Sequence, residues 1–300
     1  MAMITEATPA IGTERPAARH PFIATLRRFL TNPVGVIALT AVLGLVACAL
    51  FAPWIAPYDP VKIAPRIRFQ EPSWEHWLGT DQLGRDVLSR VIYGTGVALK
   101  VALSGTLAAL LLGGTLGILG GLSRGWLDGL LLLLCDATRS LPLILFALAI
   151  VAIYGPSLAT LIAIIAFSMA PGYFRVVRNQ VLVLGSMDFI VAAHTMGASR
   201  LRIALTHLVP NLLGPIVVLI AMDIPAVIGI ESGLSFLGQG IQPPDPSWGT
   251  MLSDGYSFIR QAPHLALAAG LPIVVSTIAF TFLGEALRDL LDPKMVRGRG

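Results

Sequence analysis

Six long apolar runs, separated by polar segments, dominate the pattern along this chain. Each is about 20 residues or longer, enough for a helix to cross a hydrocarbon core of about 30 Å. The runs cover residues 33–53, 95–122, 127–154, 156–174, 211–230 and 264–287. The second and third exceed one bilayer thickness, so we expect them to tilt or to continue as interfacial helix. No segment shows the apolar and polar alternation of a strand, so the pattern predicts an all-α polytopic membrane protein with six transmembrane helices.

Prolines inside or beside these runs predict kinks or broken turns, which a membrane helix tolerates where neighbouring helices satisfy the freed carbonyl groups. They are Pro142, Pro171, Pro215, Pro225 and Pro272.

Composition supports a membrane location. Hydrophobic residues make up 55% of the 300 residues and charged residues only 13%, whereas a soluble domain has about 25% charged residues. A water-exposed surface needs more charge than this chain holds, so much of its apolar surface must face lipid.

The distribution of lysine and arginine predicts the orientation. With the N-terminus in the cytoplasm, most of the basic residues outside the apolar runs lie on the cytoplasmic side, as the positive-inside rule requires. Both termini and the loop 175–210 are then cytoplasmic, while 54–92 and 231–263 are external loops. The net charge of +4 follows from this topology. No basic run is interleaved with aromatic residues, so nucleic acid is not an expected partner.

Short segments flank the membrane domain, which we place at residues 33–294. Residues 1–20, rich in Ala, Pro and Thr, are typical of a disordered tail, here cytoplasmic. Residues 21–32 have the pattern of an amphipathic helix on the inner membrane surface, and a simple basic flank of the first span explains them equally well. Residues 295–300 form a second cytoplasmic tail.

Motifs of catalysis and metal binding are missing from the sequence. None of the three lysines, Lys62, Lys100 and Lys294, follows a glycine, so there is no Gly-x-x-x-x-Gly-Lys phosphate loop. The sequence also has no His-Glu-x-x-His or Cys-x-x-Cys pair. We therefore expect no catalytic residue, no metal site and no cofactor bound by this chain.

Acidic residues within the fifth span are the remaining functional signal. Asp223 lies well inside the run, just before Pro225, and Glu231 lies at its outer end. Ionisable groups are costly in lipid and normally face a cavity or a partner. We predict that both residues line a translocation path or contact a partner subunit; a structural hydrogen bond is the alternative for each.

The polar segment between the fourth and fifth runs contains Val191-Ala-Ala-His-Thr-Met-Gly197, and His207-Leu-Val-Pro210 follows after nine residues. Its small alanines would let a helix lie close to a partner, Gly197 would permit a tight turn, and Pro210 would fix the start of the next helix. The segment resembles the cytoplasmic signature loop of ABC-importer permeases, which reads Glu-Ala-Ala, three residues, Gly, nine residues, then Ile-x-Leu-Pro. Val191 stands for its Glu, His207 for its Ile and Val209 for its Leu.

By this resemblance the loop forms a coupling helix that sits in a groove of a separate ATPase. The residues assigned to this coupling are Val191, Ala192, Ala193, His194, Thr195, Met196, Gly197, Ala198 and Pro210.

Longer phrases in the external segments resemble one branch of these permeases, the C-type subunits of dipeptide, oligopeptide and nickel importers. They are Trp54-Ile-Ala-Pro-Tyr-Asp-Pro60, residues 76–90, residues 231–252 and residues 287–294. From the residues themselves, Asp81, Arg85 and Asp86 could pair at a helix entrance. Trp248 has the character of a membrane-interface residue.

The resemblance implies a type I ABC importer permease in the bacterial inner membrane, working by alternating access. Its expected partners are a second, homologous permease, two ATPase subunits that hold ATP and Mg²⁺, an extracytoplasmic solute-binding protein and membrane lipid. The chain itself would form half of a path for peptides or a related solute and catalyse no reaction. Dipeptides, longer peptides, glutathione, nickel chelates and opine or sugar conjugates stay open. A stand-alone secondary transporter and a membrane-bound enzyme are the alternatives.

Overall fold

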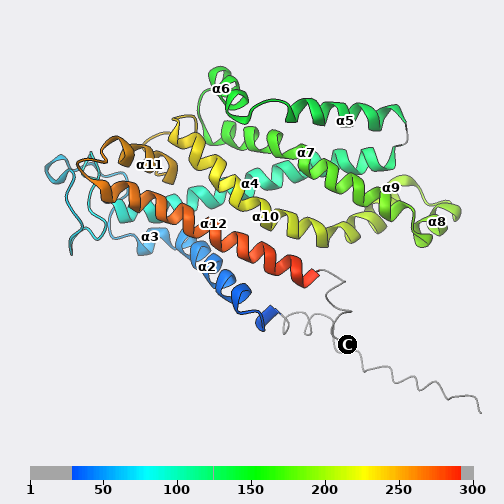
Figure 1. Cartoon of the computed structure of the whole chain (residues 1–300), viewed down its shortest axis with the longest axis horizontal. Coiled ribbons are helices and arrows are strands. Elements are labelled where there is room, and N and C mark those ends of the chain that lie inside the picture. Colours follow the sequence, from blue (N-terminus) through cyan, green and yellow to red (C-terminus); the bar gives the residue numbers. More distant parts are fainter. Residues whose placement is uncertain (1–28, 124, 292–300) are drawn as a thin grey trace, which may run out of the picture.

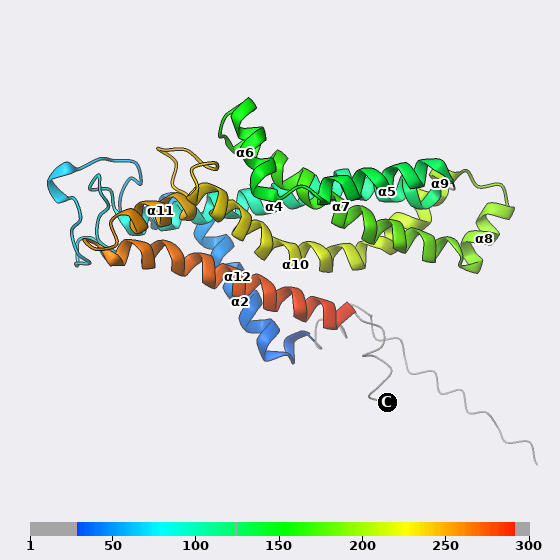
Figure 2. The same ribbon diagram turned by 45° about the horizontal axis from the view of Figure 1, so that its top comes forward.

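The computed structural model describes residues 29–123 and 125–291, and in these residues the chain is helical, without a β-strand. Five long helices form the bundle, and the first of them lies oblique to the long axis that the other four follow (Figures 1 and 2). They are α2 (Pro33–Leu50), α4 (Val87–Leu122), α7 (Leu158–Gly185), α10 (Val209–Phe236) and α12 (Pro263–Leu291). Each is long and apolar enough to cross a membrane. The predicted all-α membrane fold is confirmed. The predicted tails 1–20 and 295–300, and residues 21–28 of the helix predicted for 21–32, lie outside the described residues.

The third predicted span, 127–154, is bent. It consists of α5 (Trp126–Arg139) and α6 (Leu143–Tyr154), which meet at an angle of 89°. Helices of 14 and 12 residues are only about 21 and 18 Å long, so neither crosses the hydrocarbon core alone. The described part of the chain therefore has five spans, or six if this bent pair counts as one. The break occurs at Pro142, because proline has no N–H and disfavours helical geometry in the residue before it.

Glycines on α4 bring α4 and α7 into close contact. Gly105, Gly113, Gly117 and Gly121 lie four or eight residues apart, so they share one face of the helix. A Cβ added at Gly117 would lie 2.8 Å from the carbonyl oxygen of Phe174. Small residues at this spacing let membrane helices pack backbone to backbone. The spacing of the glycines on α4 therefore permits the close packing of α4 on α7.

Several helices extend beyond the apolar runs that predicted them. The helix α4 begins at Val87 within the predicted loop 54–92, because Asp86 accepts a hydrogen bond from the backbone N–H of Ser89 at 2.8 Å and caps the helix. The helix α7 continues to Gly185, within the predicted loop 175–210. The predicted loop 231–263 also begins within a helix, since α10 continues to Phe236. Hydropathy detects the apolar part of a helix and misses its polar ends, such as the buried Ser89 and Arg90 of α4 and the buried Glu231 of α10.

The end of the bundle opposite α8 carries a cap of loops and short helices: residues 51–86, with α3 (Ala52–Ile55), and α11 (Trp248–Ser257) (Figure 1). We call it the external cap, after the topology predicted from the basic residues. Two of its polar groups pair as expected from the sequence, since Arg85 Nε donates to Asp81 Oδ2 at 2.6 Å, whereas Asp86 contacts His76 Nδ1 at 2.8 Å. The expectation for Trp248 was wrong. Trp248 is buried and donates from Nε1 to the carbonyl oxygen of Val91 at 3.1 Å, because Gly94 leaves room for the indole ring.

Candidate functional site

The segment with the Val191 to Gly197 motif folds as the helix α8 (Asp188–Thr195), at the opposite end of the bundle from α11 (Figures 1 and 2). It ends in a tight turn at Gly197, whose φ is +83°. The N–H of Ala198 donates to the carbonyl oxygen of Ala193 at 3.1 Å and closes this turn. Glycine adopts this left-handed conformation without the steric cost that a Cβ would add.

The motif residues divide between two faces of α8. Ala193 is buried and packs with Ile190, Ile203 and Leu208 in a small core of this chain, and the partly buried Ala198 packs against the same cluster. The opposite face is open. It carries Val191, Ala192, His194, Thr195 and Met196, all exposed. The sequence motif cannot show this division, because it depends on how α8 packs against the chain that follows.

A second short helix, α9 (Arg200–Ile203), leads into α10 through a π-helical turn, Ala204–Leu208. Pro210 lies in the first turn of α10 (Val209–Phe236), where the sequence placed the start of a helix, but the backbone is already helical from Arg200. In the π turn the N–H of Val209 donates to the carbonyl of Ala204, five residues back. This wider turn makes room for the proline ring, which would otherwise crowd the carbonyl group four residues earlier.

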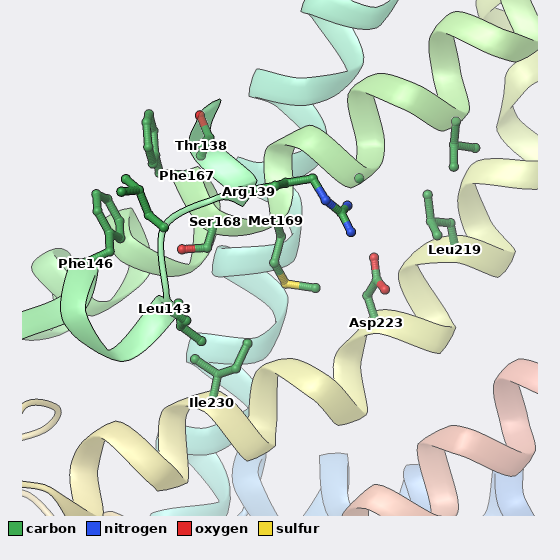
Figure 3. A pocket seen from close by; sticks show the side chains of 13 residues that line it. Thr138, Arg139, Leu143, Phe146, Phe167, Ser168, Met169, Leu219, Asp223 and Ile230 are labelled. Atoms are coloured by element: carbon green, nitrogen blue, oxygen red, sulfur yellow. The ribbon is translucent and has the colours of Figure 1, made fainter. Parts of the chain in front are cut away.

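A cavity of about 420 Å³ lies between the break that separates α5 from α6 and the helices α7 and α10 (Figure 3). Arg139 enters it from the end of α5 and Asp223 from the middle of α10, and the two side chains point toward one another. Neither forms an ion pair within the described part of the chain. Asp223, predicted to line a path, does line a cavity in the bundle. The structure adds Arg139, whose position beside the break at Pro142 was the available signal.

Glu231 lies in a different environment from Asp223. It is 1% exposed and does not line this cavity. Its Oε1 accepts hydrogen bonds from Ser235 Oγ at 2.8 Å and Ser247 Oγ at 2.9 Å, and its Oε2 accepts one from Ser232 Oγ at 3.2 Å. These contacts join the C-terminal part of α10 to Ser247, the residue that caps α11.

Two ion pairs that sequence reasoning missed join α7 to α5. Arg178 forms a two-pronged contact with Asp128, and Arg175 pairs with Asp136. The sequence suggested only that both arginines belong to a basic cytoplasmic loop. Their partners lie 50 and 39 residues away in the chain. Local sequence spacing therefore cannot predict these ion pairs. In the described ranges no three His, Cys, Asp or Glu residues come together as a metal site.

Comparison with known proteins agrees with this architecture. Residues 91–297 match the family described as binding-protein-dependent transport system inner membrane component, and residues 21–72 match the N-terminal TM domain of oligopeptide transport permease C. The glutathione transport system permease protein GsiD of Pectobacterium atrosepticum is 40% identical over 93% of each chain. The dipeptide transport system permease protein DppC of Alkalihalophilus pseudofirmus is 38% identical over 93% of this chain and 91% of its own.

Among solved structures, a chain of the MetNI methionine ABC transporter in an inward facing conformation shares the fold. It is 18% identical, with a TM-score of 0.56, and the match covers 67% of this chain and 96% of that one. This chain belongs to the family of inner membrane components of binding-protein-dependent transport systems. It is a permease subunit of an ABC importer, and the alternative of a stand-alone secondary transporter is set aside.

Proposed function

We propose that this chain forms one half of the path along which an ATP-driven importer carries peptides or glutathione across the bacterial inner membrane. The arrangement along the bundle supports this proposal most directly: an exposed helical tip at one end, the external cap at the other, and a cavity at the middle of α10 (Figures 1 and 3). The relatives named for glutathione and dipeptide transport support the class of solute.

The proposed partners are inferred from two features of this chain: it has no phosphate loop, and it exposes the α8 tip at one end and the external cap at the other. A second, homologous permease completes the path, two ATPase subunits bind the α8 tip, and an extracytoplasmic binding protein delivers solute at the external cap. ATP and Mg²⁺ belong to the ATPase subunits, since this sequence has no phosphate loop. This chain contributes no catalytic residue and binds no cofactor.

The α8 tip is the cytoplasmic end in this proposal. Arg200 and Arg202 are exposed there, in accord with the excess of basic residues on cytoplasmic segments. With α5 and α6 taken as one span, six crossings return the end of α12 to the side where α2 begins, and the two helix ends lie near one another (Figures 1 and 2). Both termini are then cytoplasmic.

Coupling uses the two faces of α8 differently. The exposed face, which includes Val191 and Met196, contacts the ATPase groove. The buried face, with Ile190 and Ala193, holds α8 against Ile203 and Leu208. Because Leu208 directly precedes α10, a displacement of α8 moves the base of the helix that carries Asp223 into the cavity. The ATPase thereby acts on the path through packed side chains.

The experiment reconstitutes the whole importer in proteoliposomes, with this chain, its second permease, the two ATPases and the binding protein, and measures uptake of labelled dipeptide and glutathione. Met196 is 81% exposed, so Met196→Asp leaves the chain folded and places an unpaired charge in the ATPase contact. Such a charge costs about 3 kcal/mol, or roughly 100-fold in affinity. We expect uptake and solute-stimulated ATP hydrolysis to fall together.

Met196→Leu is the matched control, since it keeps an apolar side chain of similar volume and should transport normally. Wild-type uptake by the Met196→Asp importer would show that this face of α8 is not the ATPase contact. Failure of the complete wild-type importer to accumulate either solute would contradict the proposed solute class.

A further inference from the structure

The cavity beside the α5–α6 break has an unusual charge arrangement for a place inside a membrane bundle. Ionisable residues at this depth are costly and are normally paired with one another or with backbone carbonyls. Here Arg139 and Asp223 point toward one another across the cavity (Figure 3), yet they form no ion pair in the described residues. Elsewhere on α5, acidic side chains do find arginine partners on α7. Arg139 and Asp223 are thus two opposite charges with space between them.

The break in the third span is what brings Arg139 to this place. A continuous helix would carry its last turn past the middle of the bundle, whereas α5 ends at Arg139 and α6 departs at 89°. The first turn of α6 has no side-chain cap, and Leu143, its first residue, lines the cavity. Discontinuous membrane helices of this kind commonly build solute sites near the bilayer midplane.

The remaining walls suit the apolar part of a small solute. Phe146 and Phe167 stack with ring centroids 5.2 Å apart, and Met169 and Ile230 also line the space. A volume of about 420 Å³ falls within the range of small-molecule sites, roughly 300 to 1,000 Å³. The cavity therefore combines an apolar wall with one cationic and one anionic group.

We propose that Arg139 and Asp223 together bind the two opposite charges of a zwitterionic solute. The planar guanidinium of Arg139 takes the solute carboxylate, to which it can donate two parallel hydrogen bonds. The carboxylate of Asp223 takes the solute ammonium group. This inference rests on the proposed function and narrows its solute class to molecules with a free amine and a free carboxylate, a chemistry that unblocked peptides and glutathione share.

A gate is the competing explanation, in which Arg139 and Asp223 pair directly when the path closes. The two explanations differ in how a variant responds to the solute. If Asp223 binds the ammonium group, Asp223→Asn does not lower the uptake of a solute whose amine is already blocked, because that solute has no ammonium group to bind. If the pair is a gate, the same variant impairs every solute equally. Removing one group from the protein and one from the solute forms a cycle that isolates their mutual interaction.

The test uses the reconstituted importer and three solutes: a free dipeptide, its N-acetyl form and its C-terminal amide. We expect Asp223→Asn to lower uptake of the free dipeptide and of the amide about tenfold, the effect of losing one charge-assisted hydrogen bond, and to leave uptake of the N-acetyl form at its wild-type rate. Arg139→Gln should lower uptake of the free dipeptide and of the N-acetyl form, and leave uptake of the C-terminal amide at its wild-type rate, because the amide has no carboxylate. Lys100→Gln and Glu285→Gln are the controls, because these exposed charged residues do not line the cavity and should transport normally.

Occupancy is measured separately through Ser168, which lines the cavity (Figure 3). In a chain without Cys48 and Cys135, Ser168→Cys should be protected from a thiol reagent by the free dipeptide and much less by either blocked form. This measurement decides the question even if the binding protein rejects blocked peptides. An equal loss for all three solutes, or no protection of Ser168→Cys in an importer that takes up dipeptide, overturns the inference alone. Absence of all peptide uptake in the assembled wild type contradicts the proposed function itself.

Discussion

Residues of similar type in this permease have different roles: some pack inside the chain, and others face the surface or a cavity. Ala192 and Ala193 are neighbours in one motif, yet Ala192 is exposed and Ala193 is buried in the chain's own core. Asp223 and Glu231 are two acids on one helix, yet one faces a cavity and the other is sealed among serine hydroxyls. Residue type is the same or similar in each pair, so the neighbouring helices and loops set the role.

Glu231 leads to a prediction at this scale. Glu231→Leu leaves the hydroxyls of Ser235 and Ser247 buried without their acceptor, and each such group costs about 1 to 3 kcal/mol. We expect the free energy of unfolding to fall by at least about 2 kcal/mol, measured by denaturant titration of the purified protein in detergent. Glu231→Gln keeps an acceptor oxygen and should lose less. Equal stability of the Leu variant and wild type would mean that the hydroxyls find other partners.

Among the elements, α4 and α7 form the most closely packed helix pair. The glycine face of α4 lets the two backbones approach, and the ion pairs of Arg175 and Arg178 attach α5 to the outer side of α7. The bend at Pro142 then turns α6 away from α5. The broken span together with α7 and α10 creates the cavity, because residues of α5, α6, α7 and α10 form its walls.

The glycine face can be tested by adding one methyl group. In Gly117→Ala the new Cβ would lie 2.8 Å from the carbonyl oxygen of Phe174 and 2.9 Å from the Cβ of Val177, so the helices must move apart. Overpacking of this kind costs about 1 to 3 kcal/mol, and we expect a matching loss of stability in the same denaturant titration.

Gly96→Ala on the same helix is the matched substitution. Its added Cβ meets nothing closer than 3.9 Å, and alanine favours the helix more than glycine does. Stability should be unchanged or slightly higher. If the two variants behaved alike, close packing of α4 on α7 would not be what stabilises the pair.

At the scale of the whole molecule, the two ends of the bundle are chemically different. One end is the α8 tip with Arg200 and Arg202, and the other is the external cap, which contains a buried polar cluster that pairs Asp81 with Arg85 and Asp86 with His76. This polarity gives the molecule the two separate contact surfaces that the proposed importer needs.

The proposed orientation is tested with single cysteines in a chain lacking Cys48 and Cys135. Ser199 lies beside α8 and Asp245 lies in the loop before α11, and both are exposed. An impermeant thiol reagent applied to intact spheroplasts should label Asp245→Cys at once and Ser199→Cys only after the membrane is opened. Labelling of Ser199→Cys in intact spheroplasts, with Asp245→Cys protected, would invert the proposed topology.

The sequence by itself determined the membrane class, the positions of most spans, the kink at Pro142 and the tight turn at Gly197. These features depend on local properties: the length of apolar runs, the missing N–H of proline and the conformational freedom of glycine. Resemblance in motifs also indicated the permease family, which the comparisons confirmed.

Only the tertiary structure decided which helix faces are open. It buried Ala193 and Trp248, placed Glu231 among three serines, passed the helix through Pro210 and brought Arg139 opposite Asp223. Each outcome depends on contacts between segments far apart in the chain, such as Trp248 with Val91 across 157 residues. Hydropathy and spacing report what a residue is and how far along a helix it lies. The packing of the other helices determines what that residue meets.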